Sequence, residues 1–186
     1  MPPSQADSAA IEYQSRMGEA LSVLLPNRDP AESIAVWRLV RAANLAERLV
    51  ESTVHRPRGR TWASFRVLIA LRSIGPTEPG TLAEILDIAP PSVSSLLSTL
   101  EKAGHITRRP DPTNRRRVIV ELTPSGNEAV ADSMAAQFDG ESAFLHGLTP
   151  EEIATLSVIL DKLLRLRWTE SPLDRVLARP STSSPD

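Results

Sequence analysis

Apolar residues recur at helical spacing along most of the chain, and prolines and glycines interrupt the pattern. The first stretch covers residues 8–25, where the apolar positions are Tyr13, Met17, Ala20, Leu21 and Leu24. This spacing predicts an amphipathic helix that ends at Pro26. A second pattern predicts a long helix over residues 31–55, whose broad apolar side includes Ile34, Trp37, Val40 and Leu49.

The middle of the chain predicts three shorter helices. Residues 55–60 are expected to form a loop, and Thr61 is placed to cap a helix from Trp62 to Ile74. Thr81 and Glu84 have the spacing of a capping box, which predicts a helix over residues 81–87. A third helix is expected over residues 91–103, with Gly104 as its C-terminal cap.

After Gly104 the apolar residues recur at every second position instead of at helical spacing. Val118, Val120 and Leu122 alternate as in a half-buried strand, and residues 110–114 supply a turn, so residues 105–122 are expected to form a β-hairpin. Helices are expected over residues 123–145 and 149–168, the latter started by a capping box of Thr149 and Glu152. The pattern predicts a mainly α fold with a small β-wing, an α+β winged helix-turn-helix lobe with further helices around it.

Length and composition are those of an ordinary folded protein. The 186 residues are 41% hydrophobic and 24% charged, enough to bury one sizeable core. No apolar run approaches the roughly 20 residues that span a bilayer. The first residues lack the basic region and apolar block of a signal peptide, so we expect a cytoplasmic protein. The absence of cysteine excludes disulfides and thiolate metal sites.

The charge is distributed unevenly. Residues 104–120 hold five arginines against Asp111 alone, a local charge of +4, although the whole chain carries −2 and the remainder therefore −6. Positive potential concentrated on one part of an acidic body steers a polyanion to that part. The alternative is that these arginines only form a solvated charged surface. The pair of helices just before them in the sequence makes that interpretation the weaker of the two.

The helix over residues 91–103 has a buried stripe of Val93, Leu96, Leu97 and Leu100 and an opposite face of small hydroxylated residues. Such a face lets a helix approach base edges in the major groove closely. Because serine is a poor helix former, a merely solvated face would usually carry Glu, Lys or Gln instead. The candidate DNA contacts are Pro91, Ser92, Ser94, Ser95, Ser98, Thr99, Arg108, Arg109, Arg115, Arg116 and Arg117.

These residues resemble the MarR (multiple antibiotic resistance regulator) family over roughly residues 35–168. The resemblance is densest over Ser92–Arg109, Asp111–Arg116 and Val120–Gly126. The family typically has a recognition helix that ends in Leu-Glu-x-x-Gly, a wing of Asp-x-x-Asp-Arg-Arg type, and then Leu-Thr-x-x-Gly. The chain departs once, with Asn114 in place of the second aspartate, which leaves an Asp–Arg brace at the wing tip open. Asn114 is expected to shape the turn or to hold an arginine.

The resemblance implies a homodimer and a small-molecule pocket, often for aromatic acids, between the dimer helices and the DNA-reading lobe. Apolar surface on helices 31–55 and 149–168 that the small lobe cannot cover agrees with a dimer. The dimerisation candidates are Ile34, Ile153, Leu156, Leu160 and Leu163. The effector-pocket candidates are Trp37, Arg41, Trp62, Phe65 and Arg66, for which plain core packing is the alternative.

We therefore expect a homodimeric, sequence-specific double-stranded DNA-binding regulator, a repressor released by a small aromatic or anionic effector. Its segments are a helical arm (1–30), a dimerisation and effector-pocket helix (31–60), a DNA-binding lobe (61–122), dimerisation helices (123–168) and a flexible tail (169–186). The alternative is a winged-helix protein-interaction module without DNA binding. No catalytic pair, phosphate loop or metal-ligand spacing around the three histidines is apparent, so no enzyme activity, cofactor or metal is expected.

Overall fold

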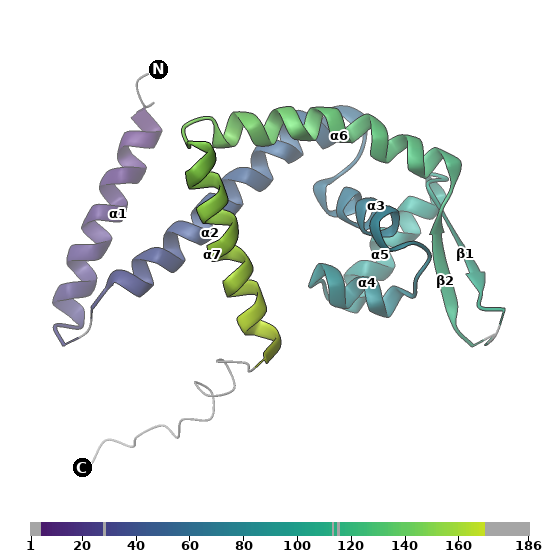
Figure 1. The fold of residues 1–186 in the computed structure, drawn as a ribbon, viewed down its shortest axis with the longest axis horizontal. Helices are drawn as coiled ribbons and strands as arrows, with labels where there is room; N and C mark the ends of the chain where they lie inside the picture. Colours follow the sequence, from purple (N-terminus) through teal and green to yellow (C-terminus); the bar gives the residue numbers. More distant parts are fainter. Residues whose placement is uncertain (1–4, 28, 113, 115, 170–186) are drawn as a thin grey trace, which may run out of the picture. The chain divides into compact units, whose positions relative to one another are not determined.

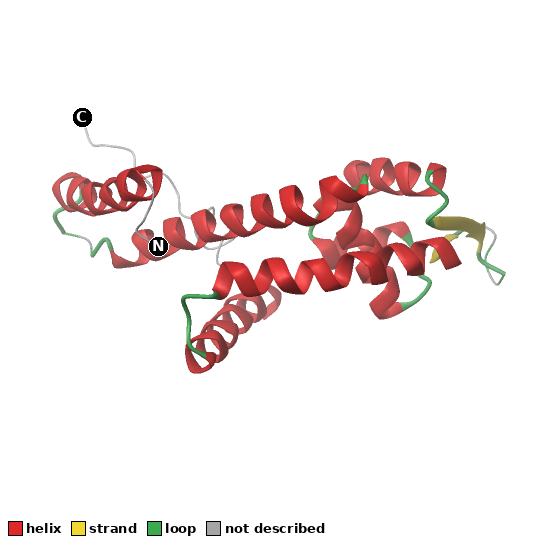
Figure 2. Ribbon diagram, turned by 90° about the horizontal axis from the view of Figure 1, so that it is seen from above, coloured by secondary structure: helices red, strands yellow, loops and turns green. Residues whose placement is uncertain are grey.

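The computed structural model describes residues 5–27, 29–112, 114 and 116–169 (Figure 1). It consists of two compact units, one that reaches to Glu141 and one that begins at Ser142. Figure 2 shows that helices dominate the described chain and that the two strands form one short hairpin. Arg115 and most of the tail predicted from residue 169 onward lie outside the described residues. Within the described ranges, no helix is both long and apolar enough to cross a membrane.

Two consecutive helices begin the first unit, close to where the sequence predicts them. α1 spans Gln5–Leu24 and α2 spans Ala31–Val50. Asp29 accepts a hydrogen bond from the backbone N–H of Ala31 at 2.9 Å and so helps to start α2. Gly18 of α1 lies against Ile34 of α2, where an added Cβ would be 3.2 Å from Ile34 Cδ1.

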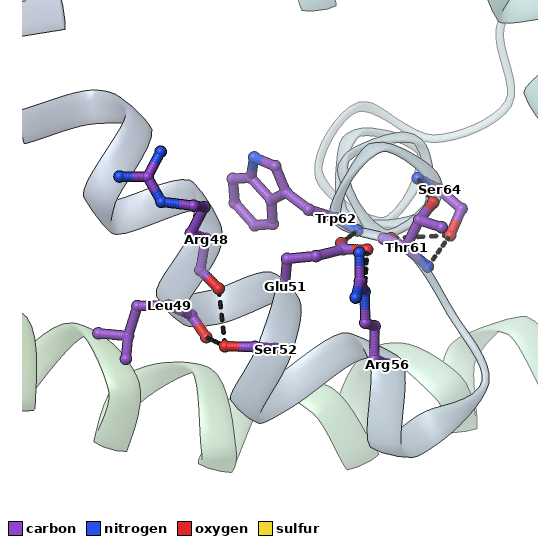
Figure 3. Close-up of polar contacts among 8 residues, drawn as sticks. All are labelled: Arg48, Leu49, Glu51, Ser52, Arg56, Thr61, Trp62 and Ser64. Carbon is purple, nitrogen blue, oxygen red and sulfur yellow. Dashed lines mark hydrogen bonds and ion pairs between the residues drawn. The ribbon is translucent and has the colours of Figure 1, made fainter. Parts of the chain in front are cut away.

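The end of the long helix differs from the prediction. α2 passes into a π-helical turn (Glu51–His55) and a 3-10 turn (Arg56–Arg58) instead of an ordinary helix followed by a loop. The Ser52 hydroxyl donates to the carbonyls of Arg48 (2.8 Å) and Leu49 (3.1 Å) in this turn (Figure 3). A π turn inserts one residue into the helix, and here two consecutive side chains at its end, Val54 and His55, are both buried.

The next elements build a lobe around one core. They are α3 (Trp62–Ile74), α4 (Pro79–Leu86), α5 (Pro90–Lys102), β1 (Ile106–Pro110) and β2 (Val118–Leu122). Buried apolar side chains from all five elements meet in that core: Val67, Leu68, Leu71, Leu82, Val93, Leu97, Leu100, Ile106 and Val120. Since the buried stripe of α5 faces this core, the opposite face of α5 is held toward solvent.

The starts of these helices test the predicted caps. Thr61 caps α3 as predicted, because its Oγ1 accepts from the Ser64 N–H at 3.1 Å while Ser64 Oγ accepts from the Thr61 N–H at 3.0 Å. The predicted capping box of Thr81 and Glu84 is wrong. α4 begins two residues earlier, at Pro79, where the missing N–H of proline leaves no bond unmade.

The predicted hairpin is confirmed. β1 and β2 are antiparallel, with Ile106 opposite Leu122 and Arg108 opposite Val120. Thr77, between α3 and α4, adds an isolated bridge to β2, with backbone N···O distances to Val120 of 3.0 and 2.8 Å. The wing is thereby attached to the helical part of the lobe on its β2 side.

α6 (Pro124–Leu145) starts directly after the wing. Thr123 Oγ1 accepts from the Gly126 N–H at 3.0 Å and donates to the Gly104 carbonyl at 2.7 Å. Arg58 and Arg60 of the preceding turn pair with Asp132 of α6 at 3.2 and 2.6 Å. α6 is therefore bound at its start to the wing base, and further along, at Asp132, to the segment around the 3-10 turn.

The second unit contains α7 (Pro150–Thr169). Its predicted capping box is confirmed: the Thr149 N–H donates to Glu152 Oε2 at 2.8 Å, and the Glu152 N–H donates to Thr149 Oγ1 at 3.3 Å. The predicted dimerisation residues on this helix are exposed or half-buried in the single chain: Ile153, Leu156, Leu160 and Leu163. α7 thus presents apolar surface that its own unit does not cover.

Candidate nucleic-acid interface

The outward face of α5 carries the predicted hydroxylated residues. Pro91, Ser92, Ser94, Ser95 and Thr99 are exposed, and Ser98 is half-buried. The Thr99 hydroxyl donates to the Ser95 carbonyl at 3.1 Å, so it is partly engaged by its own helix. The remaining small side chains leave the helix backbone accessible to a surface that approaches it.

The tip of the wing is a tight turn held by backbone hydrogen bonds. The Asp111 N–H donates to the Arg117 carbonyl at 3.0 Å, and the Arg117 N–H donates to the Asn114 carbonyl at 2.8 Å. Asn114 Oδ1 accepts from the backbone N–H of Arg116 at 3.1 Å. Asn114 therefore shapes the turn through the backbone, one of the two roles expected for it.

Three of the predicted wing arginines are paired with carboxylates. Arg108 Nε lies 3.2 Å from Glu101 of α5, and Arg117 Nη2 lies 2.5 Å from Glu78 before α4. Arg109 makes a two-pronged contact with Glu121, at 3.1 and 3.2 Å. The hydrogen bonds from Arg109 lower the pKa of the Glu121 carboxyl, and those with Glu121 raise the pKa of Arg109.

Arg116 is different. Its side chain is exposed at the tip, and in the part of the chain that the structure describes it has no ion pair. Arg115, its predicted companion, lies outside the described residues. Because three arginine charges are balanced within the lobe, the uncompensated positive charge of the described wing lies at the tip.

Sequence reasoning missed the three carboxylates that hold the wing. Glu78 lies just before α4 and Glu101 lies within α5. No local pattern in the sequence links either residue to the hairpin. The contact of Glu121 with Arg109 was the one that a hairpin register could have predicted. The observed register places Glu121 opposite Thr107 and diagonal to Arg109, within reach of a long side chain. Counting charge over residues 104–120 therefore overstates what the wing presents to a partner.

The five effector-pocket candidates do not come together. Trp37 and Arg41 line a cavity of about 260 Å³ between α1 and α2, together with Tyr13, Met17, Val40, Asn44 and Arg48. Trp62, Phe65 and Arg66 are not among the lining residues. Arg66 instead donates a short hydrogen bond to the carbonyl of Leu86, at the end of α4.

Trp62 and Phe65 pack around a buried histidine that sequence reasoning did not single out. The ring of His55 lies 5.4 Å from that of Trp62 and 4.6 Å from that of Phe65, and its Nε2 is 3.1 Å from Gln137 Oε1 of α6. Glu51 joins the same region by accepting from the Trp62 N–H at 2.5 Å (Figure 3). Among the described residues, no three histidine, aspartate or glutamate side chains gather as a metal site would need.

Known proteins of similar sequence are transcriptional regulators. The MarR family model matches residues 61–118. The multiple antibiotic resistance protein MarR of Salmonella typhimurium is 31% identical over 138 residues, which cover 72% of this chain and 93% of that protein. The uncharacterized HTH-type transcriptional regulator YwaE of Bacillus subtilis is 30% identical over 140 residues, covering 72% of this chain and 82% of that protein.

Solved structures agree with the sequence comparison. A mutant MarR from Escherichia coli complexed with operator DNA aligns with a TM-score of 0.66 and 27% identity, covering 74% of this chain and 99% of that chain. BpsR from Bordetella bronchiseptica, whose DNA binding is regulated by 6-hydroxynicotinic acid, aligns with a TM-score of 0.65 and 26% identity, covering 69% and 97%. The predicted fold class is confirmed, and the chain belongs to the MarR family, whose members are transcriptional regulators and not enzymes.

Proposed function

We propose that this chain is a sequence-specific double-stranded DNA-binding repressor that acts as a homodimer on an inverted repeat and is released by a small aromatic or anionic effector. One observation carries the proposal: the hydroxylated face of α5 is exposed on the same lobe as a wing tip whose Arg116 is unpaired among the described residues. The likeness to a MarR–operator complex supports it. We also propose the cytoplasm as the site of action.

The two parts of the lobe have different roles in this proposal. α5 enters the major groove, where Ser95 and Ser98 meet base edges. Arg115 and Arg116 meet phosphates or the narrow minor groove beside it. Arg108, Arg109 and Arg117 act as positioning residues, because their carboxylate partners hold the hairpin on the lobe.

Residues 61–122 form the DNA-binding lobe in this proposal, and residues 31–60 and 123–168 form the dimerisation region. A two-fold dimer presents its recognition helices about one helical turn apart, roughly 34–36 Å, so its half-sites mirror one another. The regulation of BpsR by an aromatic acid supports the effector. Of the effector candidates we retain Trp62, Phe65 and Arg66. All three lie in the first turns of α3, the helix with which the lobe begins.

The test is DNA binding by the purified full-length protein, on a site found by genomic footprinting and on random duplex, at several salt concentrations. Arg116→Ala should weaken binding to both duplexes alike and make the salt dependence shallower by about one unit for each phosphate that a subunit no longer neutralises. Ser95→Ala and Ser98→Ala should instead weaken binding to the preferred site more than to random DNA. Arg16→Ala, at an exposed arginine of α1 outside the proposed DNA-binding and dimerisation regions, is the matched control.

The outcomes separate the alternatives. An asymmetric footprint on a single half-site would contradict the two-fold dimer. If Arg116→Ala changes neither affinity nor salt dependence, the wing tip is a solvated turn that does not bind DNA. If the wild-type chain binds neither duplex, the protein-interaction module becomes the better interpretation.

A further inference from the structure

The wing has an outer face that the core of the lobe does not use. Ile106 and Val120 belong to that core and are fully buried. Because side chains alternate between the two faces of a strand, Thr107, Arg109 and Glu121 lie on the opposite face of the hairpin. Thr107 and Arg109 are exposed, and Glu121 is half-buried. The outer face of the wing is therefore polar and open to solvent.

On this face one carboxylate engages a whole edge of one guanidinium. Arg109 donates from Nε and Nη2 to the two carboxylate oxygens of Glu121, at 3.1 and 3.2 Å. The hydrogen bonds from Arg109 lower the pKa of the Glu121 carboxyl, so both partners are charged at neutral pH. Arginine binds a phosphate in the same two-pronged geometry. Glu121 therefore occupies the edge of Arg109 that a DNA phosphate would need.

This ion pair lies entirely within the hairpin. Arg109 and Glu121 join β1 to β2, which the backbone ladder from Ile106 to Pro110 already holds together. The two side chains are 43% and 31% exposed, and an ion pair so open to water contributes little to stability. The main consequence of the pair is then on charge, because it cancels the charge of one arginine on an exposed face of the wing.

Arg109 lies close to the part of the wing that is proposed to meet DNA. It is opposite Ile119, one residue pair before the ladder ends at Pro110 and Val118. The tip that follows carries Arg116, the arginine without an ion pair among the described residues. A guanidinium released from Glu121 would extend the positive charge of the tip along β1.

We infer that Glu121 is an internal competitor for phosphate, which withholds Arg109 from DNA and so limits the affinity of the wing for duplex of any sequence. A phosphate contact carries no sequence information, so each further free arginine strengthens binding to random DNA. A genome offers far more random sites than preferred ones, and a regulator with too many such contacts is retained on them. The inference rests on the DNA binding of the proposed function and adds the residue that restrains its sequence-independent part.

The test measures binding of the full-length protein to a labelled random duplex by fluorescence anisotropy at several salt concentrations. Glu121→Gln keeps the size of the side chain and removes its charge. At about 0.1 M salt the affinity should rise about eightfold for each bound subunit, and the salt dependence should steepen by about 0.9 unit, as one further phosphate contact requires. Glu84→Gln is the matched control, because Glu84 is an exposed carboxylate on α4 of the same lobe and makes no ion pair within the described ranges. It removes the same charge without releasing an arginine and should change the affinity by about twofold at most, since salt screens an exposed charge.

A second pair of variants shows whether the gain depends on Arg109. In a chain that carries Arg109→Ala, no guanidinium is left for Glu121 to hold. Adding Glu121→Gln to this chain should therefore change its affinity for random duplex no more than Glu84→Gln changes that of the wild type. The full gain in the absence of Arg109 would show that Glu121 repels DNA directly, and the inference would be overturned.

The remaining outcomes separate this inference from the proposed function. A wild-type chain that binds no duplex overturns the proposed function and this inference with it. If the wild type binds, and Glu121→Gln binds no more tightly than Glu84→Gln, the inference alone is overturned and DNA binding stays in place. A Glu121→Gln variant that circular dichroism shows to be unfolded would mean that the pair holds the wing together, and it too would overturn the inference.

Discussion

His55 is a fully buried imidazole at the end of the π turn, between the rings of Trp62 and Phe65. Gln137 donates its amide N–H to Glu141 at 2.7 Å, so its Oε1 is left to accept from His55 Nε2. Burial lowers the pKa of His55, and Arg60 and Arg58 lower it further, against opposing contributions from the Gln137 hydrogen bond and Glu51. The folded protein therefore favours the neutral ring.

This predicts a loss of stability in mild acid. When the pKa of a histidine is lower in the folded state, the unfolded chain binds the proton first, so the free energy of unfolding falls as the pH falls below about 6.5. His55→Gln should flatten this dependence in urea titrations between pH 7 and pH 5. His146→Gln, at an exposed histidine, is the control. An unchanged slope in His55→Gln would show that another group titrates.

Gly126 is a residue whose requirement is steric. A Cβ at this position would lie 2.0 Å from the His105 carbonyl oxygen, which is backbone and cannot move aside cheaply. Gly126→Ala should therefore lower the free energy of unfolding by about 1–3 kcal/mol, as other overpacked sites do. Gly147→Ala, where nothing lies within 4 Å, should be close to neutral. Denaturant unfolding of the two variants checks this, and equal stabilities would contradict the close approach.

For single residues, the sequence predicted which side chains are exposed better than it predicted which residues they contact. The hydroxylated face of α5 follows from helical spacing, and the structure exposes it almost as expected. The division of the arginines does not follow, because Glu78 and Glu101 reach Arg117 and Arg108 only after the chain has folded. Pairing of this kind depends on tertiary contact, for which spacing along the chain carries no signal.

The starts of α3, α4 and α7 show which local sequence signals determine where a helix begins. Thr61 and Thr149 cap α3 and α7 as their spacing predicts, but the same spacing at Thr81 and Glu84 is overruled by Pro79. The π turn was not predicted, because it accompanies the burial of two adjacent side chains, Val54 and His55. Local capping chemistry is readable from sequence where no stronger start signal lies nearby.

This difference between Thr61 and Thr81 can be measured. Thr61→Ala removes an acceptor for the Ser64 N–H and should lower the free energy of unfolding by about 0.5–2 kcal/mol. Thr81→Ala removes no cap, since Thr81 lies inside α4, and should cost clearly less. Thermal unfolding of both variants at one pH compares them directly. A larger loss in Thr81→Ala would mean that α4 starts at Thr81 in solution.

For the whole molecule, the sequence predicted more apolar surface than one lobe can hide, and the structure locates that surface. Exposed apolar side chains lie on α1, α2 and α7, among them Leu24, Val36 and Val158. A sequence pattern shows that such a face exists but not what covers it, because the covering surface can come from another copy. The core of the lobe is closed within the same unit, with Ala129 and Val130 of α6 completing it, which is why its fold was the more predictable part.

The proposed dimer makes a prediction about truncation. Removing residues 149–186 deletes α7, one of the proposed dimerisation helices, so the apolar face of α2 loses a proposed covering surface and remains exposed in water. The truncated protein should aggregate or fail to unfold cooperatively, whereas removal of residues 170–186 alone should leave the dimer and its DNA affinity unchanged. Sedimentation velocity and urea unfolding of the two truncations measure this. A soluble, monomeric and cooperatively folded chain without α7 would contradict the proposal, because it would show that the helical faces need no second copy.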